Sequence, residues 1–373
     1  MIEVKKYSFI DALRGWAVAG VIFAHTPCPP EMNYLFSFVG GKGVQLFYIL
    51  SALTLCLSLS QKRRAEANPI KNFFIRRFFR IAPMFYVAFA IFMFLNGTGP
   101  SYWAPDGLAW WHIVTTLTFT NGWHPETLNT IVFGGWSIAD EMMFYAIFPA
   151  LFAFIQTPTR AIVLTLISLV VGIYLSALAF NFWFPVYGME HLNMLNWFVE
   201  LWLPAQLSVF TLGFCLFFAF QRLRSEGPPK LKIFKPPFFA FLTLVACFGI
   251  PQLSFIPARF GFALFFVMLT YLLAMRPYKL MVNRFFIYLG KISFSVYLLH
   301  SLGIRVGTWL SDIFKVMPET YAQTAVVLSV TIPLTVAAAS FTYRYVEVVG
   351  MDYSKRVIDF LESREASKQA FLK

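Results

Sequence analysis

Long apolar runs separated by short polar connections divide this sequence, and they determine its fold class. Each run can cross about 30 Å of hydrocarbon as an α-helix, which takes about 20 residues. The chain has 373 residues, of which 58% are hydrophobic and only 13% are charged. Because a soluble core of that size cannot hide so much apolar surface, lipid must cover the remainder. The sequence therefore predicts an all-α, polytopic integral membrane protein.

About ten transmembrane helices are predicted, with both termini cytoplasmic. Lys and Arg gather in the connections after the second, sixth and eighth runs, whereas residues 97–133 and 181–202 contain neither. This alternation follows the positive-inside rule and places those two stretches, together with residues 27–40, on the outer face. Prolines in the seventh run and the polar start of the fourth leave nine or eleven helices open. The predicted spans are residues 8–26, 41–60, 78–96, 134–156, 160–180, 203–221, 236–250, 257–275, 285–304 and 322–343.

The chain is predicted to form one transmembrane domain, residues 1–346, followed by a charged cytoplasmic tail, residues 347–373. Its amino terminus is similar to a secretory signal, but Asp11 and Arg14 interrupt the apolar stretch, so we interpret it as a retained span. The net charge of +12 fits basic loops facing anionic lipid, and no nucleic acid is expected as a partner. The four cysteines lack CxxC spacing, so no metal site is expected.

The first predicted span, FIDALRGWAVAGVIFAHT, carries ionisable residues that hydrocarbon disfavours. Arg14 and His25 are eleven residues apart, which places both on one helical face. Asp11 lies one turn before Arg14 and can pair with it. For either Arg14 or His25 alone, snorkelling or an interfacial position explains the residue as well as function does. Together the three residues favour a polar channel, because ionisable groups in spans usually face a partner or a wet cavity.

A second group of polar residues opens the fourth span, FGGWSIADEMMFYAIFPAL. A carboxylate at this place is either a charge at the helix N-terminus, favoured by the helix dipole, or the partner of a base. Asp140 suits the first role. Glu141, with Tyr145 one turn further along its face, suits the second.

Two further clusters have both a structural and a functional interpretation. Arg76, Arg77 and Arg80 of RRFFRIAPMFY lie at the cytoplasmic mouth of the third span. Most such clusters are topology signals, and the alternative is a phosphate clamp, because Arg binds phosphate oxygens bidentately. In YLGKISFSVYLLHSLGI, Ser293, Tyr297 and His300 share one helical face. Hydrogen bonds between packed helices explain that face as well as chemistry does.

Taken together, these motifs resemble those of acyltransferase family 3, the ten-helix membrane acyltransferases that modify bacterial surface glycans and some secreted small molecules. The resemblance covers nearly the whole chain. It rests on the Arg, ten residues, His signature in LRGWAVAGVIFAH, on the basic loop, and on WSIADEMMFYAIFP, which holds Trp136, Ser137, Glu141 and Tyr145. GGKGVQLFYILSALTL, GKISFSVYLLH and YRYVE complete the series.

This chain departs from the family pattern at three places. The family usually has Asp where this chain has Gln45, and Ser-Gly-Phe where it has Ser51-Ala52-Leu53. The Glu-Arg-Pro that often follows the last span is replaced here by Glu347-Val348-Val349. These changes leave a diverged acceptor or an unusual acyl group open.

The resemblance implies a membrane O-acyltransferase of the cell inner (cytoplasmic) membrane, with no bound cofactor. Acyl-CoA, with acetyl-CoA as the expected form, is the implied donor, and a carbohydrate or small-molecule hydroxyl at the outer face is the implied acceptor. The resemblance makes His25 the general base or a transient acyl carrier, Glu141 its orienting partner, and Arg14 part of the route between the faces. Arg76, Arg77 and Arg80 would then hold the donor. Asp11, Ser137, Trp136, Tyr145, Tyr297 and His300 are the supporting residues.

Two other functional classes remain open from the sequence. A secondary transporter also carries charges within its spans, but such proteins usually consist of two related halves, and this sequence contains no such repeat. A non-catalytic partner in a glycan-export complex would tolerate loss of His25, Arg14 and Glu141. Substrate flux without consumption of CoA would indicate the transporter.

Overall fold

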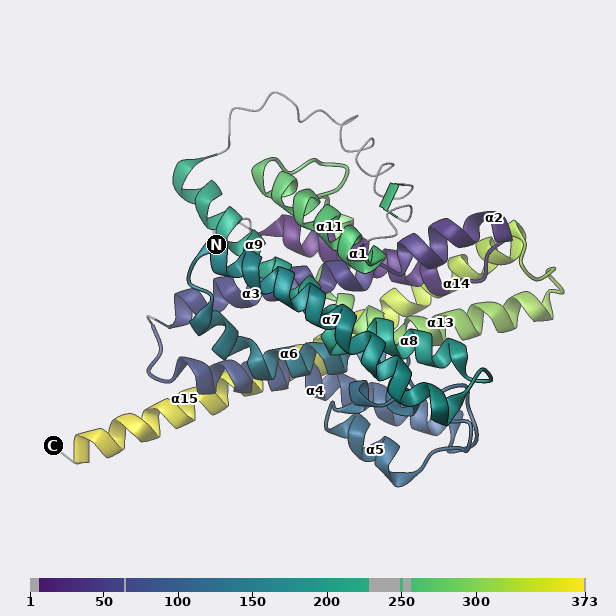
Figure 1. The fold of residues 1–373 in the computed structure, drawn as a ribbon, viewed down its shortest axis with the longest axis horizontal. Helices are drawn as coiled ribbons and strands as arrows, with labels where there is room; N and C mark the ends of the chain where they lie inside the picture. The colour runs from purple at the N-terminus through teal and green to yellow at the C-terminus, as the bar shows by residue number, and fades with distance from the viewer. Residues whose placement is uncertain (1–6, 64, 228–248, 251–255, 372–373) are drawn as a thin grey trace.

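The computed structural model describes residues 7–63, 65–227, 249–250 and 256–371, and these residues form helices without a β-strand (Figure 1). The start of α1 and the end of α15 lie on the left side of the molecule in Figure 1, and α2 and the connection between α13 and α14 lie at its right end. The predicted all-α class is confirmed. The elements are α1 (Ser8–His25), α2 (Pro30–Asn33), η2 (Tyr34–Gly40), α3 (Gly43–Lys62), α4 (Pro69–Asn96), α5 (Trp110–Leu117), η3 (Asn121–Trp123), η4 (Pro125–Thr127), α6 (Gly135–Phe154), α7 (Pro158–Tyr187), α8 (Leu192–Leu201), α9 (Leu203–Glu226), α11 (Ala258–Met275), α12 (Arg284–Lys291), α13 (Ser293–Ile313), α14 (Tyr321–Thr342), η6 (Tyr343–Glu347) and α15 (Val348–Phe371).

Seven helical segments of the described chain are long and apolar enough to cross a membrane, and an eighth is added if α12 and α13 form one bent span. The first predicted span folds as α1 but is not among them, because Asp11, Arg14 and His25 lower its mean hydropathy. The protein is thus a multi-pass membrane protein, and ten spans stay a prediction. The seven segments are Pro30–Lys62, Pro69–Asn96, Gly135–Phe154, Pro158–Tyr187, Leu192–Glu226, Ala258–Met275 and Tyr321–Glu365.

Several predicted boundaries differ from the observed ones. The third span begins at Pro69 rather than at residue 78, because proline fits the first turn of a helix, where its missing N–H is not needed. The span predicted at residues 285–304 is two helices, α12 and α13, that meet at 85°. The span predicted at residues 236–250 lies almost wholly outside the described residues.

Close backbone contact with α1 holds the bend between α12 and α13. A methyl group on Gly290 would lie 1.7 Å from the Asp11 carbonyl oxygen, and one on Gly15 would lie 2.2 Å from the Phe286 carbonyl oxygen. Only glycine permits such an approach at both places. As a result α12 lies directly against the first half of α1, and α13 begins beside it.

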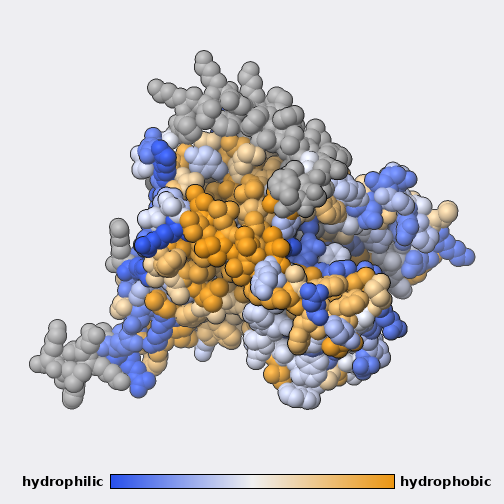
Figure 2. All heavy atoms as spheres, in the orientation of Figure 1, coloured by the Kyte–Doolittle hydropathy of each residue, from blue (hydrophilic) through white to orange (hydrophobic). Residues whose placement is uncertain are grey.

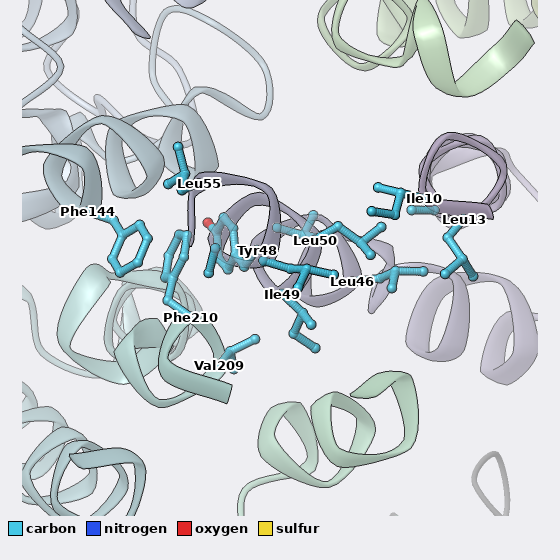
Figure 3. Packing of buried hydrophobic residues seen from close by; sticks show 14 of the residues in the cluster. Ile10, Leu13, Leu46, Tyr48, Ile49, Leu50, Leu55, Phe144, Val209 and Phe210 are labelled. Atoms are coloured by element: carbon cyan, nitrogen blue, oxygen red, sulfur yellow. The ribbon is translucent and has the colours of Figure 1, made fainter. Parts of the chain in front are cut away.

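The hydrophobic core is built around α3, which is surrounded by α1, α6 and α9 (Figure 3). The Tyr48 and Phe210 rings stack with centroids 4.1 Å apart, and Phe144 stacks on Phe210 at the same distance. Such aromatic pairs are worth about 0.5–1.5 kcal/mol beyond the area they bury. This core fixes the positions of the helices that carry the candidate site.

The outer surface of α7 is the clearest lipid-facing part of the molecule. In its most apolar stretch only 22% of residues are buried, against 78% in the segment that contains α3. The exposed side chains include Val170, Tyr174 and Phe182. Figure 2 shows the broad hydrophobic area that results on this face. Hydrocarbon is the solvent that suits such a surface.

The C-terminal segment predicted as a charged tail is a helix packed against the bundle. The π-helical turn η6 joins α14 to α15, which contacts α4. The Asn72 amide donates to Glu362 at 2.7 Å, and Lys71 pairs with Glu365 at 3.0 Å. Glu347, where the tail was predicted to begin, is completely buried. The tail is therefore packed on the bundle as far as Glu365.

Replacing Glu347 by alanine is expected to destabilise the protein by about 3–5 kcal/mol, as expected when a buried ion pair loses one partner. The Glu347 carboxylate accepts from Arg80 at 2.7 Å, from the Ser295 hydroxyl at 2.5 Å and from the Ser295 N–H at 3.1 Å. Thermal unfolding in detergent measures the effect. Glu226→Ala removes the exposed Arg222–Glu226 pair and is the control, with no measurable shift expected. Equal melting temperatures for Glu347→Ala and Glu226→Ala would show that the contacts of Glu347 do not stabilise the fold.

Candidate active site

A cavity of about 740 Å³, here called the inner cavity, lies between α1, α3, α4, α6, α12, α13 and α15. Its volume is in the range of small-molecule sites. One end, its mouth, lies among residues of α15 and of the stretch 62–76, from the end of α3 to the first turns of α4, and the other end reaches Ser137 and Tyr297. Its ionisable lining residues are Asp11, Arg14, Lys62, Glu66, Arg76, Arg77, Arg80, Glu141, Lys291, Lys355, Asp359 and Glu362.

The three arginines predicted as a clamp all line the inner cavity, but only one lacks an acidic partner. Arg76 donates to both oxygens of Glu66, at 2.9 and 3.1 Å, and Arg80 is held by Glu347. Among the described residues no carboxylate pairs with Arg77, whose Nε is buried without a hydrogen-bond partner. Its guanidinium lies 5.8 Å from the centroid of the Tyr145 ring. Arg77 is therefore the arginine most available to a bound anion.

Glu66 stays charged beside Arg76. Burial raises the pKa of this carboxyl, but hydrogen bonds from Lys62 and Asn72 and the charge of Arg76 outweigh burial and hold the pKa below its ordinary value. Lys62 pairs with Glu66 at 2.9 Å. This network fixes the side chains at the mouth of the cavity.

Arg14 faces the inner cavity rather than the membrane surface. Its guanidinium lies 3.6 Å from the Asp11 carboxylate and donates to the Thr54 hydroxyl at 3.2 Å. The predicted pairing of Asp11 with Arg14 is thus confirmed. Thr54 comes from α3, so the contact ties α1 to α3 at about the middle of the cavity wall.

Glu141 lies deeper in the inner cavity, on α6, and its partners are hydroxyl groups. Ser51 donates to it at 2.5 Å, and Tyr145, one turn along the same helix, also donates to it. The predicted contact between Glu141 and Tyr145 is confirmed. Glu141 makes no hydrogen bond to His25 among the described residues. The direct contact with that imidazole, expected for an orienting partner, is therefore not formed.

From the sequence we expected Asp140 to be a charge at the N-terminus of a helix. The structure does not place it there. Because α6 begins at Gly135, Asp140 lies in the second turn, and its side chain is completely buried. It accepts a hydrogen bond from the Tyr48 hydroxyl at 3.2 Å. The helix dipole acts mainly on the first turn, so packing of α3 against α6 explains this residue better.

The end of the inner cavity that lies away from its mouth is closed by hydroxyl groups from α6 and α13. The Ser137 hydroxyl donates to the Tyr297 oxygen at 2.7 Å, and the Tyr297 hydroxyl donates to the Gly134 carbonyl at 3.1 Å. Trp136 packs edge-on against Tyr48, with ring centroids 6.4 Å apart. Ser137 and Tyr297 therefore belong to the wall of the inner cavity. Trp136 does not line this cavity and instead packs α6 against α3 through Tyr48.

His25 and His300 form a pair just beyond this end. His300 Nε2 lies 3.3 Å from His25 Nδ1, and the two ring centroids are 5.1 Å apart. Phe133 packs against both imidazoles, with centroid distances of 4.9 and 5.5 Å. His300 is buried, whereas the His25 side chain is exposed.

The hydrogen bonds of this pair determine its tautomers. His300 Nδ1 lies 2.6 Å from the Tyr297 carbonyl oxygen, which only accepts, so Nδ1 carries the proton and Nε2 is an acceptor. His25 Nδ1 faces that acceptor and also the Val21 carbonyl at 2.9 Å, so it carries a proton as well. The Nε2 atom of His25 is left with a free lone pair. An imidazole held in this way is arranged as a base or nucleophile.

A second cavity, of about 340 Å³ and here called the outer cavity, lies further along α13. Phe133 and Arg305 are among its lining residues. In order along α13, Ser293 and Tyr297 line the inner cavity, His300 contacts His25, and Arg305 lines the outer cavity. The histidine pair thus lies between two cavities that approach it from opposite directions.

Two of the departures from the family pattern, Gln45 and Ala52, have structural explanations. The Gln45 amide donates to Gln206 at 3.3 Å, and Gln206 donates to the Glu200 carbonyl at 2.8 Å, so neutral amides connect α3 to α9. Ala52 packs on Gly213, where an added methyl group would lie 2.5 Å from the Ala52 Cβ atom. The extra carbon of Ala52 is therefore matched by a glycine opposite.

Four residues of the site had no role assigned from the sequence. Ser51 and Thr54 lie within a motif of the resemblance, but their contacts with Glu141 and Arg14 cross between helices. Glu347 ends the YRYVE motif, and Phe133 is the first residue of FGGWSIADEMMFYAIFPAL. Local periodicity does not reveal such contacts, because it says which residues share a face but not which faces meet.

Comparisons with known proteins agree with these observations. The family model of the acyltransferase domain, Acyl_transf_3, matches residues 7–344. The chain is 27% identical over 289 residues to acyltransferase MdmB of Streptomyces mycarofaciens, which covers 72% of this chain and 69% of that protein. No solved structure matches significantly.

Similarity to two OatA proteins covers a shorter region. Peptidoglycan O-acetyltransferase OatA of Listeria monocytogenes is 29% identical over 154 residues, or 38% of this chain. O-acetyltransferase OatA of Staphylococcus aureus is 28% identical over 162 residues, or 39% of this chain. The matched regions span only 23% and 24% of those two proteins. Because the family match extends over almost the full chain, the protein belongs to acyltransferase family 3.

Proposed function

We propose that the protein is a membrane O-acyltransferase that moves an acyl group, expected to be acetyl, from cytoplasmic acyl-CoA to a hydroxyl at the outer face. The observation that carries this proposal is the placement of the His25–His300 pair between the inner and outer cavities. Membership of the family and the O-acetyltransferase names of two relatives support the type of reaction. The acceptor is a glycan or a small molecule.

The inner cavity faces the cytoplasm in this proposal, and the bilayer is the cell inner membrane. The start of α1 and the end of α15 lie on the same side of the molecule in Figure 1, which agrees with two cytoplasmic termini. Residues 62–76, which run from the end of α3 into the first turns of α4 and are rich in Lys and Arg, border the mouth of the inner cavity. Basic loops of this kind remain on the cytoplasmic side.

The donor enters through the basic mouth of the inner cavity. Arg77 contacts a phosphate of CoA, and Arg76 and Arg80, already paired with carboxylates, hold the surrounding helices in place. The pantetheine arm then extends past Arg14 towards Ser137 and Tyr297, where the inner cavity ends. Glu141 keeps the Ser51 and Tyr145 hydroxyls fixed along this route.

The chemical step takes place at His25. Nε2 removes the proton of the acceptor hydroxyl, the oxygen bonds to the thioester carbonyl carbon, and the carbon–sulfur bond breaks. The CoA thiolate then takes the proton from His25, so that charge and atoms balance. A second route uses the same atom as a nucleophile: Nε2 bonds to the thioester carbonyl carbon and the carbon–sulfur bond breaks, which releases the CoA thiolate. The acceptor oxygen then bonds to the acyl carbon, the bond from that carbon to Nε2 breaks, and the hydroxyl proton passes to the CoA thiolate. His300 holds the imidazole in the required tautomer on either route, as the third member of a triad does.

Arg77→Gln is expected to raise the KM for acetyl-CoA at least about tenfold with little change in kcat, because a hydrogen bond to a charged group is worth about 1.5–3 kcal/mol. Steady-state kinetics on purified protein in liposomes measure both constants. Arg63→Gln is the matched control, because Arg63 lies over Phe152 and does not line the inner cavity. A KM equal to that of Arg63→Gln would place the CoA phosphates elsewhere.

The proposed function is tested by release of CoA from acetyl-CoA in liposomes, with wild type and His25→Ala compared at equal monodispersity. We expect release by the wild type and background release by His25→Ala. Equal release by the two proteins would exclude His25 from the chemistry. Transport of a solute without any release of CoA would instead identify a transporter.

A further inference from the structure

The outer cavity has the features of a site for an anionic sugar. Arg305 is the charged residue among those that line the outer cavity. Most of the other lining residues come from residues 97–133, a stretch that contains neither Lys nor Arg. In the proposed orientation this is the outer face, where basic residues are disfavoured near spans. A topology signal therefore does not explain Arg305.

The Arg305 guanidinium is oriented but not neutralised. It donates to the Asn96 side-chain oxygen at 2.7 Å, and it lies 6.0 Å from the centroid of the Phe92 ring. Within the described chain, no carboxylate forms an ion pair with it. Because a guanidinium has five N–H donors and Asn96 occupies one, the others are available to a bound carboxylate or phosphate.

The rest of the lining suits a sugar ring. Tyr102 and Trp103 present aromatic surface with a polar tip, and Asn129 adds an amide group that can bond hydroxyls. Phe133 connects the outer cavity with the two imidazoles, since it lines this cavity and packs edge-on against both His25 and His300. A sugar held here would thus lie next to the proposed base.

We propose that the outer cavity is the acceptor site and that it selects a sugar bearing a carboxylate or phosphate, which Arg305 binds. The inference rests on the proposed function, and it specifies in addition that the acceptor is negatively charged. Arg305 follows His300 by five residues, a rise of about 7.5 Å along α13, and the two side chains lie about 140° apart around the helix. Phe133 bridges this difference, because it lines the outer cavity and packs on both His25 and His300. The anionic group would therefore lie at Arg305, and the reacting hydroxyl would lie on the Phe133 side of the outer cavity.

Binding of small sugars to the full-length protein in detergent tests this site without any need for turnover. Saturation-transfer NMR would give the Kd of methyl glucuronide and of methyl glucoside, which share a ring and differ by a carboxylate. We expect wild type to bind the glucuronide about tenfold more tightly and Arg305→Gln to bind both alike. Arg305→Lys should retain part of the preference. Lys315→Gln, which removes a charge just after α13 and outside the outer cavity, should retain all of it.

Equal Kd values for the two sugars in the wild type, or a preference that persists in Arg305→Gln, would overturn the proposal. Glucose 6-phosphate in the same experiment tells whether a phosphate is preferred to a carboxylate. His25→Gln should bind the glucuronide as the wild type does, so a failure of catalysis leaves this result intact. CoA release from the same preparations reports on the proposed function separately.

Discussion

Replacement of His25 by glutamine is expected to lower acyl transfer about 10²–10⁴-fold, the range typical for loss of a general acid–base group. Glutamine has an amide near the position of the ring nitrogens but no basic lone pair, so it can neither take a proton nor carry an acyl group. The effect should appear in kcat, because the imidazole acts on the reacting atoms after the donor has bound. Acylation of the acceptor, followed with radiolabelled acetyl-CoA, measures it.

The matched control for this variant is His191→Gln, since His191 precedes α8 and lines neither cavity. It should retain the activity of the wild type. Both variants should elute as monodisperse protein with unchanged melting temperatures. Transfer by His25→Gln within a few-fold of the wild type would remove His25 from the mechanism on either route.

Replacement of His300 by leucine is expected to lower kcat about 10²-fold while the KM for acetyl-CoA stays unchanged. Loss of the correct tautomer reduces kcat about 10⁴-fold in a serine protease triad. A smaller effect is expected here, because the Val21 carbonyl still accepts from His25 Nδ1 at 2.9 Å. His300→Gln can present an oxygen to that N–H and should recover part of the rate.

A purely structural role for His300 makes a different prediction. His300 is buried, so its loss could lower the melting temperature without any specific effect on the reaction. In that case kcat and KM would change together, and His300→Gln would be no better than His300→Leu. Equal kcat values for the two variants at matched stability would exclude His300 as a positioning residue.

The sequence predicts the helices well because membrane spans carry a strong local signal. The apolar runs correspond to α3, α6, α7, α9 and α11 with small errors at their ends. The bend between α12 and α13 was missed, since it depends on the contact of Gly290 with α1 rather than on composition. The packing of the charged tail on α4 could not be predicted either, because it depends on contacts between residues far apart in the sequence. Glu362 and Glu365 pair with Asn72 and Lys71 on α4.

The candidate site is a harder case, as Glu141 and His300 show. The sequence indicates that both are polar groups in apolar helices, where a partner is needed. It does not indicate which partner, because that depends on how α1, α3, α6 and α13 pack. Glu141 was expected to orient His25, yet it binds Ser51 and Tyr145, and His300 contacts His25 instead. The residue types in the sequence were enough to identify these polar side chains. Their hydrogen-bond partners could be assigned only from the packing of the helices.

The central claim is that an acyl group passes from the inner cavity, through the histidine pair, to an acceptor on the opposite face. Membrane vesicles of known orientation test it most directly, with labelled acetyl-CoA added outside and the native acceptor present in the membrane. Inverted vesicles expose the proposed cytoplasmic face and should incorporate label in a way that depends on His25. Right-side-out vesicles should incorporate none. Equal incorporation by both kinds of vesicle, or incorporation by right-side-out vesicles alone, would contradict the account.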